Sequence, residues 1–171
     1  MTALRDAAIV GVGQTVIGTH PDQTWEMLAA EAVRMALEDA GVRKEEVDGL
    51  VVIPPMVEAS VIPNLVLADY LGLHRIRFST QPGMAGGNGL QALYLAAQAI
   101  CYGLADTVLV VGADNPLTGR SPGAVYGGAP TDPWGTFAPS TYAHTATRPR
   151  AEYGPTEPQR ASSMWFPGSL H

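Results

Sequence analysis

Short and long hydrophobic segments alternate along the first two thirds of the chain. The short segments are continuous apolar runs, which predict buried strands at residues 7–12, 50–53, 76–80 and 107–113. The longer segments between them repeat their apolar residues with helical spacing and predict helices at residues 25–40, 65–71 and 90–103. An order in which strands and helices alternate predicts an α/β fold with a mostly parallel sheet covered on both faces.

Residues at the ends of the first two predicted helices agree with this assignment. Thr24 or Asp22 can cap the first helix, and Gly41 can end it in the left-handed conformation. Pro63 stands just before residues 65–71, where a proline can open a helix.

The third helix follows a turn that is rich in glycine. The turn contains Gly83, Gly86, Gly87 and Gly89, and the Ala/Leu run behind it is apolar on nearly every side. We therefore expect this helix to be buried at the centre of the molecule. The glycines allow a ligand or a backbone to approach the helix N-terminus, where free N–H groups and the helix dipole favour negative charge.

The composition changes after the fourth predicted strand. Glycine and proline are frequent from Asn115 onward, with little periodicity. We therefore divide the chain into a core at residues 1–113, a Gly/Pro-rich loop region at 114–160 and an irregular tail at 161–171. A long loop of this kind is usually functional or disordered.

Charge and cysteine content exclude several classes of function. The net charge is −6, with 46% hydrophobic and 15% charged residues and no cluster of basic side chains, so neither nucleic acid nor an anionic membrane is an expected partner. Cys101 is the single cysteine, which excludes an internal disulfide and a cysteine-built metal site, and we expect no metal. No apolar run reaches the ~20 residues needed to span a bilayer, so we expect a cytoplasmic protein.

Three common glycine motifs do not fit. Gly11 and Gly13 follow a predicted strand, but the third glycine of a dinucleotide fingerprint would fall at Val16. The turn before the third helix has neither the Lys-Ser/Thr pair of a P-loop nor the serine of a Gly-x-Ser-x-Gly elbow.

The sequence Gly-Gly-Asn-Gly-Leu-Gln-Ala at residues 86–92 resembles the nucleophile turn of thiolases, which reads Cys-Ala/Gly-Ser-Gly-Leu-Gln-Ala. Residues 7–15, 31–48 and 103–112 also resemble segments of that family. The resemblance implies the first half of a thiolase: three α/β/α layers around a mixed, mostly parallel sheet. It also implies a fifth, antiparallel strand from beyond Pro130, and a homodimer with residues 76–80 at the interface.

The sequence departs from thiolases at the nucleophile. Gly86 stands in place of the cysteine whose thiolate takes up the acyl group. Cys101 lies about four turns further along the helix, where we expect a small core residue. The glycine-rich turn is more similar to that of cysteine-less, lipid-transfer or sterol-carrier-type relatives. Some of these are retro-aldolases that cleave a β-hydroxyacyl-CoA in steroid side-chain breakdown, without a covalent acyl-enzyme and with an OB-fold, zinc-ribbon partner.

The resemblance implies a site at the turn. We expect Met84, Gly86, Gly87 and Asn88 to contact an acyl-CoA substrate, with no separate cofactor. No catalytic residue is assigned. Residues 142–148, with 152–154, resemble a helix in the loop region of the aldolases, and its His144 and Tyr142 are candidates for acid/base chemistry. Tyr126 and Tyr153 are further candidates, and all four side chains can equally pack over an apolar patch.

Two functions remain open. The first is a thiolase-like protein of acyl-CoA or sterol side-chain metabolism, part of a C–C lyase or an acyltransferase-like protein. The alternative is a non-catalytic module that binds acyl-CoA, a lipid or a partner protein. Nothing after about Arg160 resembles the family, and its second-half residues have no counterpart, so the chain looks truncated or diverged. We do not expect these 171 residues to be active alone.

Overall fold

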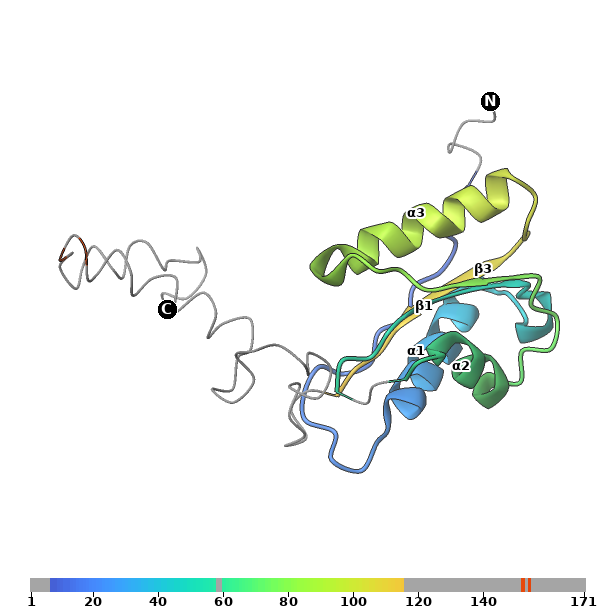
Figure 1. Cartoon of the computed structure of the whole chain (residues 1–171). Coiled ribbons are helices and arrows are strands. Elements are labelled where there is room, and N and C mark those ends of the chain that lie inside the picture. Colours follow the sequence, from blue (N-terminus) through green and yellow to red (C-terminus); the bar gives the residue numbers. More distant parts are fainter. Residues whose placement is uncertain (1–6, 58–59, 116–151, 153, 155–171) are drawn as a thin grey trace. The chain divides into compact units, whose positions relative to one another are not determined.

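The computed structural model describes residues 7–57, 60–115, 152 and 154. The helices and strands named below all lie in the first of two compact units, residues 1–125. The three strands form a parallel sheet with the order β2-β1-β3 (Figure 1). In chain order the elements are α1 (Trp25–Ala40), the 3₁₀ turn η2 (Lys44–Glu46), β1 (Gly49–Ile53), α2 (Pro63–Leu71), β2 (Phe78–Thr80), the 3₁₀ turn η3 (Ala85–Gly87), α3 (Asn88–Cys101) and β3 (Val108–Gly112).

The sheet lies between two helical layers, as predicted. Leu50 and Val52 pack with α1 and α2 on one face, whereas Val51 packs with Ala92 and Ala96 of α3 on the other. This alternation follows from the period of two along a strand. Figure 1 shows α3 on one side of the sheet and α1 and α2 on the other, so the three-layer arrangement is confirmed.

The predicted ends of the first two helices are also confirmed. The Thr24 hydroxyl accepts a hydrogen bond from the Met27 N–H at 3.4 Å, so Thr24 rather than Asp22 is the N-cap of α1. Gly41 ends α1 with a φ of 64°. Pro63 is the first residue of α2, where its missing N–H costs no helical hydrogen bond.

The strand predicted at residues 7–12 is wrong. This segment forms no strand, and it lies alongside α1 instead of joining the sheet. The Val12 N–H donates to Asp39 Oδ2 at 2.9 Å, and a Cβ built on Gly11 would lie 2.7 Å from the Ala40 backbone nitrogen. Both neighbouring positions of β1 are occupied by β2 and β3, so the apolar run has no place beside it.

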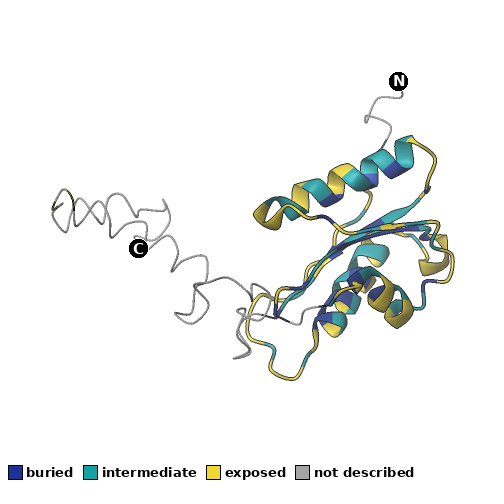
Figure 2. Ribbon diagram, in the orientation of Figure 1, coloured by how far each residue is buried: buried dark blue, intermediate teal, exposed yellow. Residues whose placement is uncertain are grey.

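The prediction that α3 is buried on nearly every side is also wrong. Ala92, Ala96 and Ala99 are buried against the sheet, but Leu90 is 80% exposed and Tyr94 is 52% exposed. Figure 2 shows this division, with the dark blue residues of α3 facing the strands and the yellow ones facing away. Only one face of the helix is covered by the described part of the chain.

Two predictions fall outside the described residues: the antiparallel strand from beyond Pro130 and the helical segment at 142–148. The three strands that are described run parallel. Within residues 7–57 and 60–115, no helix is long and apolar enough to cross a membrane.

Candidate functional site

The candidate site is the turn that joins β2 to α3. It lies at the carboxyl edge of the parallel sheet, where ligands of open α/β sheets commonly bind. The turn contains η3, and α3 begins directly after it at Asn88.

Two side-chain amides from α3 hold the turn. The Gly83 N–H donates to Gln91 Oε1 at 2.9 Å, and the Met84 N–H donates to Asn88 Oδ1 at 2.7 Å. A backbone hydrogen bond of 2.9 Å from the Gly87 N–H to the Met84 carbonyl closes η3. The turn therefore has a defined shape although it carries many glycines.

One residue of the turn has an unusual backbone. Ala85 has a φ of 47°, the left-handed region, and it is the one non-glycine residue of the described ranges with a positive φ. This conformation costs an L-residue roughly 1–2 kcal/mol. Strain of this size persists where surrounding contacts fix the backbone, and the hydrogen bonds on both sides of Ala85 do so here.

Gly86 follows the strained residue and is exposed. A Cβ built on Gly86 would meet no described heavy atom within 4 Å, apart from its own chain neighbours. Its φ also lies outside the left-handed region. Neither crowding nor backbone conformation therefore requires glycine at this position, and a larger residue would fit.

The turn brings the four predicted substrate-contacting residues together. Met84 and Gly86 are exposed, and Gly87 and Asn88 are half-buried. The Oδ1 atom of Asn88 is already engaged by the turn itself, a role that the sequence did not reveal. The sequence analysis did not assign Gln91 to the site. A polar amide in a mostly apolar helix was a signal that could have found it. The four candidates for acid/base chemistry, Tyr126, Tyr142, His144 and Tyr153, lie outside the described residues.

Two polar residues after β3 tie other loops to the same edge of the sheet. Asp114 accepts hydrogen bonds from the N–H groups of Met56 at 2.9 Å and Val57 at 3.2 Å. The buried Asn115 donates through Nδ2 to the carbonyls of His20 and Gln23, at 2.7 and 2.9 Å. The carboxyl ends of β1 and β3 and the segment before α1 are thereby fixed together.

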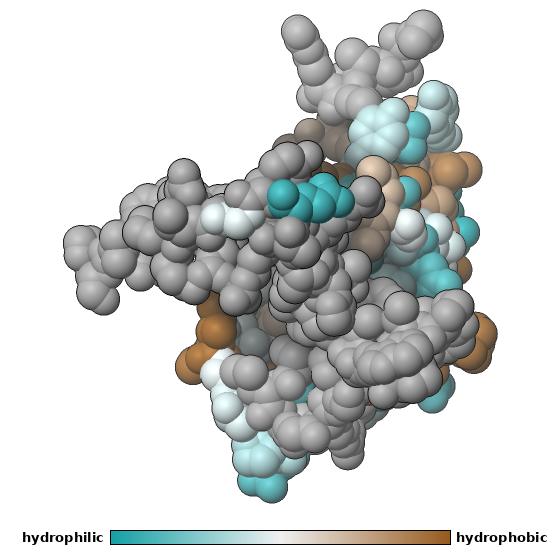
Figure 3. Space-filling model, turned by 60° about the vertical axis from the view of Figure 1, so that its left-hand side comes forward, coloured by the Kyte–Doolittle hydropathy of each residue, from teal (hydrophilic) through white to brown (hydrophobic). Residues whose placement is uncertain are grey.

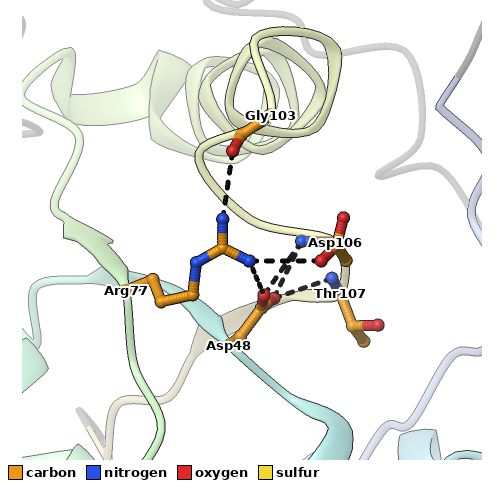
Figure 4. A network of polar contacts seen from close by, with 5 residues as sticks. All are labelled: Asp48, Arg77, Gly103, Asp106 and Thr107. Atoms are coloured by element: carbon orange, nitrogen blue, oxygen red, sulfur yellow. Dashed lines mark hydrogen bonds and ion pairs between the residues drawn. The ribbon is translucent and has the colours of Figure 1, made fainter.

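A second polar network lies at the opposite, amino edge of the sheet (Figure 4). Asp48 Oδ1 accepts hydrogen bonds from the N–H groups of Asp106 and Thr107, at 2.9 and 2.8 Å. Arg77 contacts Asp48 at 3.0 Å and Asp106 at 3.2 Å, and it donates to the Gly103 carbonyl at 3.1 Å. The network was not predicted, yet the sequence gives a sign of it, since charged residues stand just before all three strands.

The environment of Asp48 changes its acidity. Burial of the carboxylate acts to raise its pKa, but the N–H groups of Thr107 and Asp106 and the Arg77 guanidinium outweigh that effect. The pKa of Asp48 is therefore lowered from its ordinary value of 3.8. Because this network lies at the edge away from the turn, we regard it as part of the scaffold.

The described ranges contain no group of three or more His, Cys, Asp or Glu side chains that could hold a metal ion. What the carboxyl edge offers is a helix N-terminus behind an open, uncharged turn. Such a terminus favours a group that carries or develops negative charge.

Comparison with known families decides what kind of protein this fold belongs to. Residues 7–121 match the model of the thiolase N-terminal domain. The chain belongs to the thiolase family. Its glycine-rich turn and α3 lie inside the matched region.

Relatives of this thiolase-family chain include different enzymes. An acetyl-CoA acetyltransferase of Methanothermobacter thermautotrophicus is 32% identical, over 92% of this chain and 43% of the relative. A steroid side-chain-cleaving aldolase of Thermomonospora curvata is 30% identical, over 88% of this chain and 41% of the relative. The chain therefore spans less than half the length of these curated relatives.

A solved structure gives the same picture. The Ltp2-ChsH2(DUF35) aldolase superposes with a TM-score of 0.58 and 30% identity, covering 87% of this chain and 39% of that one. The family and the half-length match are thus supported by both sequence and structure.

Proposed function

We propose that this thiolase-family chain acts on an acyl-CoA without forming a covalent acyl-enzyme, as the N-terminal part of a C–C lyase of the retro-aldolase type. The observation that carries the proposal is Gly86, which we assign to the position of the thiolase nucleophile. It is exposed in an open turn directly before α3 and has no side chain with which to attack a thioester.

Cys101 does not replace the missing nucleophile. It is the last residue of α3, and Gly86 precedes the first. At 1.5 Å per residue, the helix separates the two positions by roughly 20 Å. A thiol at that distance cannot attack a carbonyl held at the turn.

Retro-aldol cleavage fits a site without a thiolate. A base removes the proton of the β-hydroxyl, the Cα–Cβ bond breaks, and a carbonyl forms at the β-carbon. The electron pair of that bond passes to the thioester as an enolate, which then takes up a proton at Cα. The N-terminus of α3 would stabilise the enolate oxygen, because its free N–H groups and dipole favour negative charge.

The relatives favour this reaction, and they suggest what completes the site. The similarity to a steroid side-chain-cleaving aldolase supports a steroid side-chain or other β-hydroxyacyl-CoA as substrate. The solved aldolase contains a second protein, ChsH2(DUF35), so we also propose a partner protein for this chain. A homodimer through β2 and a cytoplasmic location remain predictions.

The alternative is a module that binds acyl-CoA, a lipid or a partner without catalysis. The observation in its favour is coverage, since the chain spans 43% of one relative and 41% of another. Acid/base residues from the remainder of such a protein would then be needed for cleavage.

Product analysis tests the proposal. We predict that the purified chain gives no thiolysis of acetoacetyl-CoA and no covalent acyl adduct in its intact mass, because Gly86 supplies no thiolate. Cleavage is tested on the complete protein, of which we propose this chain to be the N-terminal part. Incubated with a β-hydroxyacyl-CoA and the partner protein of an aldolase relative, that complete protein should release an aldehyde or ketone and the shortened acyl-CoA.

The outcomes separate the two functions. Thiolysis above background, or an acyl adduct, contradicts the proposed function. Saturable binding of the acyl-CoA by the complete protein without cleavage, with the partner present, favours the binding module instead.

A further inference from the structure

We infer that Gln91 and Asn88 are positioning residues of the proposed site, which hold the turn that carries Gly86 through two uncharged amide oxygens. This inference rests on the proposed function, because it assumes that the turn faces the substrate. It assigns Asn88 a different role from direct substrate contact, and it adds Gln91.

Both amides hold N–H groups of the two residues directly before the strained Ala85. Gln91, on the first turn of α3, reaches back eight residues to the Gly83 N–H. Asn88, the first residue of α3, reaches back four residues to the Met84 N–H. Two consecutive N–H groups of the turn are thus fixed to two residues one helical turn apart, which sets the position of the turn relative to the helix axis.

The chemical type of these acceptors is informative. A carboxylate would accept the same hydrogen bonds more strongly than an amide. However, residues 78–105 contain no Asp, Glu, Lys or Arg, so the site combines neutral acceptors with an uncharged helix. A negative charge at position 88 or 91 would repel an enolate or thioester oxygen at the helix N-terminus. Amide acceptors hold the turn without that repulsion.

A thiol introduced at the turn can report on this arrangement. We would use the full chain with Gly86→Cys and Cys101→Ala, because the structure leaves room for a side chain at Gly86. Two quantities are measured: the pKa of the introduced thiol, from iodoacetamide alkylation against pH, and the exchange rate of the Gly83 amide hydrogen, by NMR.

Removing the acceptor should release the turn. In the Gln91→Met background we expect Gly83 amide exchange to accelerate severalfold. Alkylation at pH 7 should slow about threefold to tenfold, as the pKa of the thiol returns toward the free value of ~8.5. Gln98→Met is the matched control, since Gln98 is a half-buried glutamine further along α3, and both quantities should stay within about twofold.

A charged acceptor separates geometry from electrostatics. Gln91→Glu keeps an oxygen for the Gly83 N–H, so amide exchange should stay slow. The pKa of the thiol should nevertheless rise, and this rise should shrink at high salt because it is electrostatic. If Gln91→Met does not fold, Asn88→Ala applies the same test through the Met84 amide.

The results distinguish this inference from the proposed function. A lowered thiol pKa that responds to Gln91→Met no more than to Gln98→Met overturns the inference alone. A thiol of ordinary pKa in the Gly86→Cys chain, before any change at Gln91, overturns the placement of Gly86 and the inference with it.

Discussion

Asp48 connects the amino ends of the three strands through side-chain and backbone hydrogen bonds. Its carboxylate binds the N–H groups that precede β3, and its carbonyl accepts from the N–H groups of Arg77 and Phe78 at 2.7 and 3.3 Å. The side chain is 14% exposed, compared with 86% for Asp106. The two carboxylates that contact Arg77 therefore differ in their importance for stability.

We predict that Asp48→Asn lowers the free energy of unfolding at pH 7 by about 1.5–3 kcal/mol, the usual contribution of hydrogen bonds to a charged group. The amide of asparagine can accept through only one atom, and its NH₂ group would face the Arg77 guanidinium. Because the folded pKa of Asp48 lies below its ordinary value of 3.8, the carboxylate's contribution is complete above that pH and is lost as pH falls through the folded pKa. Urea unfolding between pH 2 and 7 should therefore show a weaker dependence on pH in the variant.

Asp106→Asn is the matched control for this prediction. It removes the same charge from an exposed side chain, where an ion pair contributes ~0–1 kcal/mol. Equal losses of stability in the two variants would contradict the account of Asp48.

Single residues were predictable from the sequence only where a local motif marked them. Gly86 could be assigned to the nucleophile position because the residues around it form a recognisable turn, and this assignment stays a prediction. Asp48 was missed because its partners Asp106 and Thr107 lie 58 and 59 residues away in the chain. Gln91 was missed because the shape of the turn decides which of its N–H groups a side chain can reach.

At the scale of elements, local chemistry and tertiary context differ in what they allow to be predicted. The caps of α1 and the start of α2 depend on neighbouring residues, so Thr24, Gly41 and Pro63 were identified correctly. A strand requires a partner, and the run at residues 7–12 lies beside α1 instead. Its hydrophobicity did not predict this, because an apolar run is equally suited to either place.

Helix α3 has two faces with different requirements. Ala96 is 7% exposed and packs with Val51 of β1. We predict that Ala96→Leu destabilises the chain by about 1–3 kcal/mol, because the larger side chain overpacks that contact. The measurement is thermal or urea unfolding followed by circular dichroism.

Leu90→Gln is the comparison on the opposite face of α3. Leu90 is exposed, so this change should alter stability by no more than about 0.5 kcal/mol. The comparison is made at a concentration at which the chain is monomeric. If Leu90→Gln then costs as much as Ala96→Leu, another part of the same chain covers the outer face of α3, which contradicts its exposure in the structure.

At the scale of the molecule, the described residues leave apolar side chains at the surface, and Figure 3 shows some of them in brown beside hydrophilic residues in teal. Large side chains that are exposed include Leu90 and Tyr94 on α3 and Leu65 and Tyr70 on α2. Exposed apolar patches drive association.

We therefore predict that the chain associates at micromolar concentration, and that Leu90→Gln combined with Tyr94→Gln reduces the association. Light scattering measures the mass of the species directly. A monodisperse species of 18.0 kDa for the unmodified chain would contradict this prediction.

The central claim is that Gly86 occupies the position of a thiolase nucleophile, before a helix N-terminus that favours negative charge. The most direct test is the rate of iodoacetamide alkylation at pH 7 of the Gly86→Cys, Cys101→Ala chain, compared with the same chain unfolded in urea. We predict faster alkylation in the folded chain, because the helix N-terminus lowers the pKa of the introduced thiol below ~8.5. Alkylation no faster than in the unfolded chain would contradict the claim.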